Sequence, residues 1–208
     1  MKILFQGDSI TDASRDRSDD TNLGRGYALL VEAELGYEVP EKYQFINRGI
    51  GGDRVLDIYT RMRTDILDIK PDVMSILIGV NDVWHGIAES DKEGIDAEKY
   101  YTIYDMLIED IKRELPELKI MILEPFVLKG WATEEQLDTF NVEVRKRAVM
   151  AKKIAEKYNL PFIPLQEGFT ELSKKAEESY WLYDGVHPTI KGHEYIKREW
   201  LKTFNKLQ

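Results

Sequence analysis

Short apolar runs that alternate with longer amphipathic stretches are the feature that most constrains how this chain folds. The run from Val73 to Ile78 is apolar at every position except Ser75, which is typical of a strand buried on both faces. The stretches between such runs carry apolar residues at helical spacing. Strands that alternate with helices build a parallel sheet with helices on both sides. The sequence therefore predicts a three-layer α/β/α fold around a mostly parallel, five-stranded sheet.

The expected elements follow from the same pattern. Strands are predicted at Lys2–Gln6, Tyr43–Ile46, Val73–Ile78, Lys119–Leu123 and Phe162–Ile163. Helices are predicted near Gly26–Gly36, Val55–Ile69, Ala97–Leu115, Glu134–Tyr158 and Ile190–Leu207, with prolines ending the second and third of them. Long loops are expected at Asp12–Leu23 and Val83–Asp96, on the side of the sheet where specificity is usually set. With 208 residues, we expect a single domain over 1–208.

Composition excludes several kinds of function. The chain has no cysteine, which removes a thiol nucleophile, disulfides and thiolate zinc sites. A formal net charge of −9 argues against nucleic acid or an anionic membrane as partner and favours a neutral substrate. No apolar run reaches the roughly eighteen residues of a membrane span. The amino terminus resembles a strand more than a secretory signal, so we expect a cytoplasmic protein.

A serine stands directly after the first expected strand. Gly7-Asp8-Ser9 follows the apolar run Ile3-Leu4-Phe5. A strand that ends in a glycine turn and then opens a helix leaves its turn residues at the carboxyl edge of the sheet, where open α/β folds bind ligands. A nucleophilic role for Ser9 is one interpretation. Capping of the helix by Ser9 or Asp8 explains this motif alone equally well.

A carboxylate and a histidine lie three residues apart near the other end of the chain. Asp184-Gly185-Val186-His187 is closed by a proline, and in such a turn Asp184 would accept a hydrogen bond from His187 Nδ1. The other ring nitrogen would then be free to take a proton. A serine hydroxyl needs such a base, and the base needs a third group to orient it.

Two further motifs follow expected strands. Gly51-Gly52 follows the second strand and Asn81 follows the third, so both are expected at the carboxyl edge. The backbone N–H of Gly52 and the side-chain amide of Asn81 would stabilise the negative oxygen that develops during acyl transfer. Taken singly, the glycines fit an ordinary turn and Asn81 fits a helix cap.

The order and spacing of these four motifs resemble the signature of the SGNH, or GDSL-type, serine hydrolases, with Ile10 where the family name implies leucine. The resemblance implies a flavodoxin-like sheet and an esterase that works without a metal or an organic cofactor. It implies that Ser9 is the nucleophile, His187 the base and Asp184 its orienting group. It also implies an oxyanion hole formed by the Ser9 amide, Gly52 and Asn81.

Outer residues are similar to those of the intracellular acetylxylan esterases within that family. The similar positions are Arg15, Gly24-Arg25-Gly26-Tyr27, Val83-Trp84 and Glu124-Pro125-Phe126, whereas Tyr183 stands where those esterases have tryptophan. The resemblance implies an acetylated, xylo-oligosaccharide-like sugar as the ester substrate. A lipid-directed esterase, lysophospholipase or thioesterase with the same catalytic residues is the alternative. A non-catalytic binding or scaffold protein is a more remote one.

The remaining candidates have two interpretations each. Arg54 and Trp84 are candidate substrate contacts, but Arg54 would also suit an ion pair and Trp84 would suit packing under the loop. His193 and His85 are expected in packing or surface roles. Asp8 and Asp12 are expected to fix the helix start and the loop, and Asp82 to support Asn81. Trp131, Trp181 and Trp200 are expected in the core or an interface, and exposed aromatics such as Tyr180 leave a homo-oligomer open.

Overall fold

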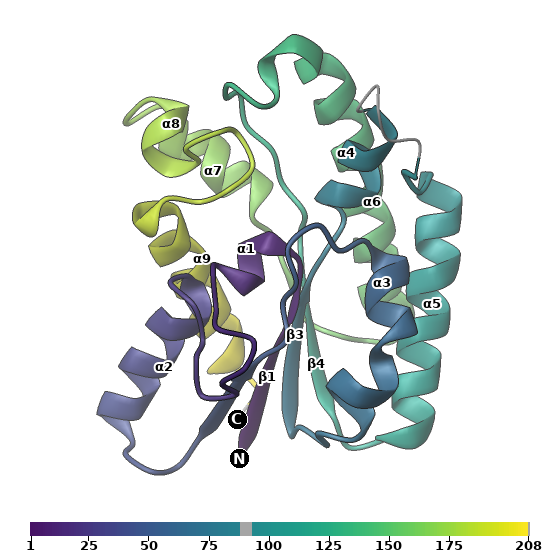
Figure 1. Cartoon of the computed structure of the whole chain (residues 1–208), viewed down its shortest axis with the longest axis vertical. Coiled ribbons are helices and arrows are strands. Elements are labelled where there is room, and N and C mark those ends of the chain that lie inside the picture. Colours follow the sequence, from purple (N-terminus) through teal and green to yellow (C-terminus); the bar gives the residue numbers. More distant parts are fainter. Residues whose placement is uncertain (88–92, 208) are drawn as a thin grey trace.

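The structure, a computed structural model, describes residues 1–87 and 93–207. Its centre is a parallel five-stranded sheet in the order β2-β1-β3-β4-β5 (Figure 1). The strands are β1 (Lys2–Gly7), β2 (Gln44–Asn47), β3 (Val73–Leu77), β4 (Lys119–Leu123) and β5 (Phe162–Ile163). All four neighbouring pairs are parallel. The predicted five-stranded parallel sheet is therefore confirmed.

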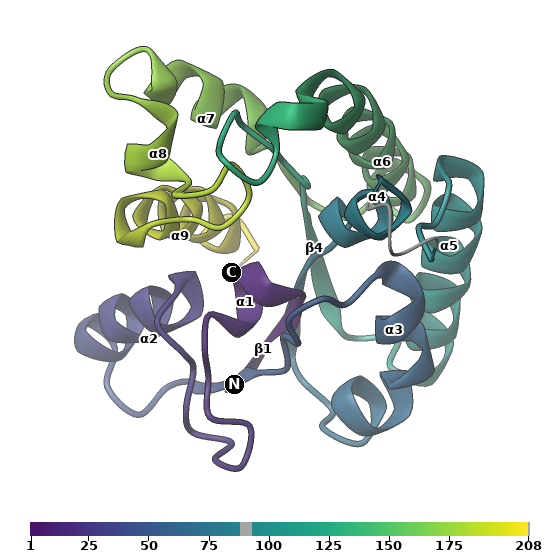
Figure 2. The ribbon, with the colours of Figure 1, turned by 45° about the horizontal axis from the view of Figure 1, so that its top comes forward.

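Helices cover both faces of this sheet, and the strands alternate their side chains between them (Figures 1 and 2). On one face, α2 (Tyr27–Glu38) and α9 (Ile190–Phe204) pack over Ile3 and Phe5. On the other, α3 (Val55–Thr60), α5 (Ala97–Glu114) and α6 (Leu137–Lys157) pack over Leu4 and its neighbours. Trp200 of α9 is fully buried and lies 5.4 Å from the ring of Phe5. The predicted three-layer arrangement follows from this period-two alternation.

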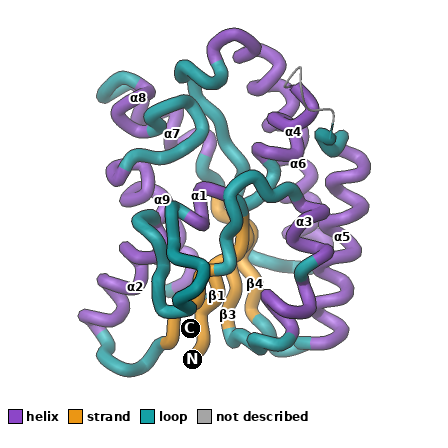
Figure 3. The backbone as a smooth tube through the Cα atoms, in the orientation of Figure 1, coloured by secondary structure: helices purple, strands orange, loops and turns teal. Residues whose placement is uncertain are grey.

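Shorter helices complete the chain, and some of them differ from the prediction. They are α1 (Ser9–Asp12), α4 (Val80–Ile87), α7 (Gln166–Ser173) and α8 (Glu178–Trp181). The loop expected from Val83 is wrong at its start, because α4 runs to Ile87 and carries Trp84 and His85. Positions 88–92 of that expected loop lie outside the described residues. The polar loop after Asp12 is present, running from α1 to α2 (Figure 3).

Two expected helices are interrupted or begin differently. The helix expected over 55–69 divides into α3, which ends at Thr60, and a π-helical turn at Arg63–Leu67. Arg61 lies at the junction and binds both Asp53 and Asp65 with its guanidinium, at 2.6 Å each. Hydrophobic periodicity does not predict this interruption of the helix, because the contacts at the junction are between polar side chains. The helix expected from Glu134 begins as a 3₁₀ turn, Glu134–Gln136, before α6.

The residues that follow the strands gather at one end of the sheet, away from the two termini (Figures 1 and 3). Ser9 follows β1, the Gly51-Gly52 turn follows β2 and Asn81 follows β3. The turn that holds His187 leads into α9 at the same end. Among the helices of the described ranges, none has the length and apolar character needed to cross a membrane.

Candidate active site

Ser9, His187 and Asp184 form a continuous chain of hydrogen bonds. Ser9 Oγ lies 2.8 Å from His187 Nε2, and His187 Nδ1 lies 2.6 Å from Asp184 Oδ2. The second oxygen of Asp184 accepts hydrogen bonds from the backbone N–H groups of Val186 and His187, at 2.9 and 2.7 Å. Ser9 and His187, which are 178 positions apart in the sequence, are thus in direct contact. The hydrogen bonds run from Ser9 to His187 to Asp184, as expected from the sequence.

The turn that carries His187 depends on Gly185. Its φ of +99° lies in the left-handed region, and a Cβ at this position would lie 2.7 Å from the Leu128 carbonyl oxygen. A side chain there would therefore force the turn away from its support. An antiparallel bridge between Leu182 and Pro188 closes the turn. Asp184 and His187 are consequently held in one geometry relative to each other.

The electrostatics of the pair favour an ionised carboxylate beside the imidazole. Burial raises the pKa of Asp184, but the hydrogen bonds from the His187 ring and from the backbone outweigh it and hold the pKa below its usual value. The hydrogen bond to Asp184 raises the pKa of His187 above its ordinary 6.5, against the opposing effect of burial. His187 is therefore a stronger base than a free histidine.

Backbone and amide donors surround the Ser9 hydroxyl. A Cβ at Gly51 would lie 3.7 Å from Ser9 Cβ, so the Gly51-Gly52 turn packs against the serine. Within the described residues, neither the Ser9 N–H nor the Gly52 N–H donates a hydrogen bond to another group. Asn81 Nδ2 donates to the Asp53 carbonyl at 3.1 Å and keeps a second hydrogen for another acceptor.

Acidic residues at this end of the sheet fix helix starts and loops, as expected for Asp8 and Asp12. Asp8 caps α1 by accepting the Ile10 N–H at 2.9 Å. Asp12 accepts the backbone N–H groups of Arg15 and Gly51. Asp82 differs from the expectation: its carboxylate accepts the Val55 N–H at 3.2 Å and so ties α4 to the start of α3, instead of bonding the Asn81 side chain.

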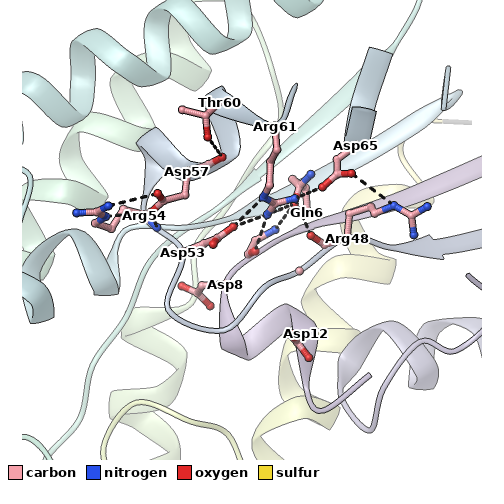
Figure 4. Close-up of polar contacts among 12 residues, drawn as sticks. Gln6, Asp8, Asp12, Arg48, Asp53, Arg54, Asp57, Thr60, Arg61 and Asp65 are labelled. Carbon is pink, nitrogen blue, oxygen red and sulfur yellow. Dashed lines mark hydrogen bonds and ion pairs between the residues drawn. The ribbon is translucent and has the colours of Figure 1, made fainter. Parts of the chain in front are cut away.

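Arg61 holds the glycine turn through several polar contacts, which the sequence patterns did not indicate (Figure 4). Arg61 binds Asp53, the Gln6 side chain at 2.9 Å and the carbonyl of Arg48 at 2.9 Å. It therefore links β1 to both ends of the Gly49–Asp53 turn. The only sequence signal was the four-residue spacing of Arg61 and Asp65, which is common on any helix surface.

The two candidate substrate contacts have other partners. Arg54 Nε lies 2.9 Å from Asp57 Oδ2 in a capping interaction at the start of α3, which corresponds to the ion-pair interpretation (Figure 4). The Trp84 ring lies 5.8 Å from the ring of Phe140 and 6.1 Å from that of His187. Trp84 thus contacts the histidine itself.

A pocket of about 460 Å³ opens beside Ser9 and His187, within the usual size range of small-molecule sites. Arg54 and Trp84 are not among the described residues that line it. Its lining residues are Ser9, Ile10, Asp12, Ala13, Ser14, Arg17, Arg25, Gly51, Tyr183, His187, Pro188 and His193. Several of these come from the polar loop after α1, whose residues carry no periodic signal that would mark them as pocket residues.

The other candidate histidines and tryptophans have varied environments. His193 is 7% exposed and its Nδ1 accepts the Tyr27 N–H at 3.2 Å, in agreement with a packing role. Trp200 is buried in the core as expected, whereas Trp131 is 70% exposed. Over the described ranges, no group of three or more His, Cys, Asp or Glu side chains is arranged to hold a metal ion.

Comparisons of the whole chain with known proteins point to one family. The model of the GDSL-like lipase/acylhydrolase family matches residues 5–195. An acetylxylan esterase from Geobacillus stearothermophilus is 32% identical over 209 residues, covering 97% of this chain and 92% of that protein.

Solved structures agree. A protein described as a GDSL-like lipase, from Parabacteroides merdae, superposes with a TM-score of 0.91 at 36% identity, covering 97% of this chain and 94% of that one. Axe2, an acetylxylan esterase from G. stearothermophilus, gives a TM-score of 0.87 at 31% identity, with 97% and 93% covered. The chain therefore belongs to the GDSL-like lipase/acylhydrolase family. It is a carboxylic ester hydrolase with the fold of that family.

Proposed function

We propose that this esterase removes acetyl groups from acetylated carbohydrates through an acyl-enzyme on Ser9. His187 Nε2 takes the Ser9 proton while Ser9 Oγ bonds to the ester carbonyl carbon. Asp184 holds the imidazole tautomer and stabilises its cation. The bond to the sugar oxygen then breaks as that oxygen receives the proton from His187. Water, activated by the same histidine, hydrolyses the acetyl-enzyme and regenerates Ser9.

The tetrahedral oxyanion is assigned to three donors, the N–H groups of Ser9 and Gly52 and the amide of Asn81. The two backbone groups have no acceptor within the described residues, and Asn81 keeps one free hydrogen. A pre-aimed donor of this kind typically lowers the barrier by about 3 kcal/mol. The single observation that carries the proposal is the unbroken Ser9–His187–Asp184 hydrogen-bond chain beside these donors.

The carbohydrate assignment rests on similarity and on the pocket. Axe2 is described as an acetylxylan esterase and an acetyl-xylooligosaccharide esterase, and three of its structures are catalytic mutants with alanine in place of an aspartate, a serine or a histidine. In this chain the pocket beside Ser9 carries polar and charged side chains such as Arg17 and Arg25. A polar pocket supports a sugar over a long acyl chain.

Acetate release tests the proposal. The purified enzyme is assayed on acetylated methyl xyloside and acetylated xylo-oligosaccharides, beside p-nitrophenyl esters of increasing acyl length. We expect acetate release from the sugars and highest kcat/KM on the shortest ester. Ser9→Ala and His187→Ala are each expected to lower kcat by at least about 10⁴-fold, since residues that act as a unit fail together.

The alternatives predict other outcomes. A kcat/KM that rises with acyl chain length would indicate a lipid-directed esterase or thioesterase with the same catalytic residues. Retained activity in both alanine variants would contradict the triad assignment. Self-association is compatible with either activity, because Tyr180 is 47% exposed and so available to an interface between two copies of the chain. Size-exclusion chromatography with light scattering measures it.

A further inference from the structure

The lining of the pocket beside Ser9 includes an arginine, Arg25, that is not paired with an acidic side chain of the described residues. Three of its lining residues carry a formal charge, apart from histidine: Asp12, Arg17 and Arg25. Arg17 Nη2 lies 2.5 Å from Asp12 Oδ2, so these two charges offset each other. Arg25 is exposed and forms no ion pair or side-chain hydrogen bond with any described residue. Of these three charged lining residues, Arg25 is therefore the one without a partner among the described residues.

The backbone around Arg25 is fixed relative to the nucleophile. The Arg25 N–H donates to the carbonyl oxygen of Ala13, at 2.8 Å, and Ala13 directly follows α1, which begins with Ser9. The next residue, Gly26, packs so closely on His193 that a Cβ there would lie 2.8 Å from the imidazole Cε1. The backbone of Arg25 is consequently held by contacts with Ala13 and, through Gly26, with His193.

His193 contributes a second, neutral donor to the same pocket. Its Nδ1 accepts the Tyr27 N–H, so in the neutral ring the proton is on Nε2. Burial, together with the nearby His187, lowers the pKa of His193 to about 4. His193 is therefore neutral at physiological pH and offers the pocket an N–H donor.

We infer that Arg25 and His193 form a subsite for a carboxylate, and that the preferred substrate is an acetyl ester of a sugar unit that also carries a uronic acid group. This inference rests on the proposed carbohydrate esterase function and narrows it. A guanidinium binds a carboxylate with two parallel N–H groups, and a neutral imidazole N–H adds a third donor. One unbalanced cation matches a single negative charge, whereas a phosphate dianion would call for more.

Because the chain as a whole is acidic, we expect this subsite to act only on a substrate that is already close to it. A net charge of −9 does not attract anions from a distance, and charges farther apart than about 8 Å are screened at physiological ionic strength. Arg25 therefore acts on a substrate that has already entered the pocket. Its effect is expected in discrimination between substrates.

A matched substrate pair tests the subsite. Fully acetylated methyl glucuronoside is supplied with a free carboxylate or as its neutral carboxamide, and kcat/KM for acetate release is measured on each. We expect the wild-type protein to favour the carboxylate by about three- to tenfold, the range of a charge-assisted hydrogen bond at a partly exposed site. About 0.5 M NaCl is expected to narrow this ratio.

Variants locate the effect. Arg25→Gln is expected to bring the ratio close to one, Arg25→Glu to invert it, and Arg25→Lys to retain part of the preference. The ratio is independent of the amount of active enzyme, so partial misfolding does not imitate the result. Arg113→Gln is the matched control, because Arg113 is an exposed arginine of α5 that pairs with Asp110 outside the pocket. Its ratio is expected to equal that of the wild type.

The outcomes separate this inference from the proposed function. A wild-type ratio near one, or a preference that persists in Arg25→Gln, overturns the carboxylate subsite. Acetate release from acetylated methyl xyloside would leave the carbohydrate esterase function standing in that case. Failure on every acetylated sugar, with p-nitrophenyl acetate still hydrolysed, overturns both.

Discussion

Asp184 determines both the orientation and the basicity of His187. One of its oxygens accepts the imidazole N–H and the other accepts two backbone N–H groups of the same turn. These bonds keep the carboxylate ionised in a buried position, where a bare charge would be costly. The ionised carboxylate in turn raises the pKa of His187. The pKa of His187 is therefore set within the short turn from Asp184 to His187, and the spacing of these two residues is visible in the sequence.

The pH dependence of the reaction follows from this pair. In the proposed mechanism His187 must be neutral to accept the Ser9 proton, and its pKa lies above 6.5, so kcat/KM is expected to fall as the pH decreases through a value above about 6.5. Asp184→Asn is expected to shift that acidic limb to lower pH and to lower kcat by about 10⁴-fold. The measurement is kcat/KM for p-nitrophenyl acetate between about pH 5 and pH 9.

Asp8 provides the control for that profile. Burial raises the pKa of Asp8 to about 7, partly offset by its hydrogen bond from Ile10, so this carboxylate titrates in the same range. An acidic limb that persists in Asp8→Asn and shifts in Asp184→Asn belongs to His187. An unchanged limb in Asp184→Asn would show that another group controls the profile.

At the scale of elements, α4 is the part of the site that the sequence pattern placed least well. Its first residues, Val80 to Asp82, were expected as a strand end and cap, and Trp84 as part of a loop. As a helix, α4 presents the Trp84 ring to Phe140 of α6 and to His187. We therefore expect Trp84 to position the His187 ring, a role that depends on a contact with a distant part of the chain.

A substitution separates positioning from substrate binding. Trp84→Ala is expected to lower kcat about tenfold with little change in KM, because His187 loses a ring that restricts its orientation. Trp84→Phe is expected to retain most of the activity. Trp131→Ala, at an exposed tryptophan, is the control and is expected to behave as wild type. A raised KM with unchanged kcat would instead support the direct substrate contact expected from the sequence.

The sequence predicted the long elements correctly, because burial of one face makes apolar residues recur at a regular spacing along the element. The strands at Lys2, Val73 and Lys119 begin at the predicted residues. The interruption at Arg61 and the short helices α7 and α8 were missed, since each depends on side-chain contacts with other elements or is too short to show a period. Element ends therefore depended on tertiary contacts.

At the scale of the whole molecule, buried carboxylates make stability depend on pH. Burial raises the pKa of Asp8 and of Asp82 to about 7 each. A group whose pKa is higher in the folded state contributes stability that is fully present below its unfolded pKa of 3.8 and is lost as the pH rises through about 7. The opposite holds for Asp184, whose lowered pKa contributes stability that is lost in acid.

We therefore expect the free energy of unfolding to be larger near pH 5 than near pH 8. Asp82→Asn is expected to reduce this difference, because the amide keeps the shape without the titration. Urea unfolding followed by circular dichroism at both pH values measures it. The exposed substitution Asp19→Asn is the control. A free energy of unfolding that increases from pH 5 to pH 8 would contradict the assignment of these two carboxylates.

The net charge shows how a whole-chain property differs from a local one. From the sequence, the acidic net charge favoured a neutral substrate. A net charge, however, does not say where in the fold each charged residue lies. In the fold, Asp12 is paired by Arg17 while Arg25 remains unbalanced in the pocket. Among the described residues, the unpaired charge on the lining of this pocket is therefore opposite in sign to the net charge of the molecule.

The layered α/β fold and the family could both be predicted from the sequence alone, because hydrophobic periodicity and short motifs are local properties of the chain. The motifs and the family resemblance also predicted that Ser9, His187 and Asp184 belong to one site, and these three residues are in hydrogen-bond contact in the fold. The surroundings of the site became visible only in the fold: Arg61 bonded to the glycine turn, Trp84 beside His187, and Arg25 and His193 on the lining of one pocket. Trp84 and Arg25 lie far in sequence from His187 and His193, and the contacts of Arg61 depend on the turn that precedes its helix, so none of these neighbours leaves a periodic pattern in the sequence.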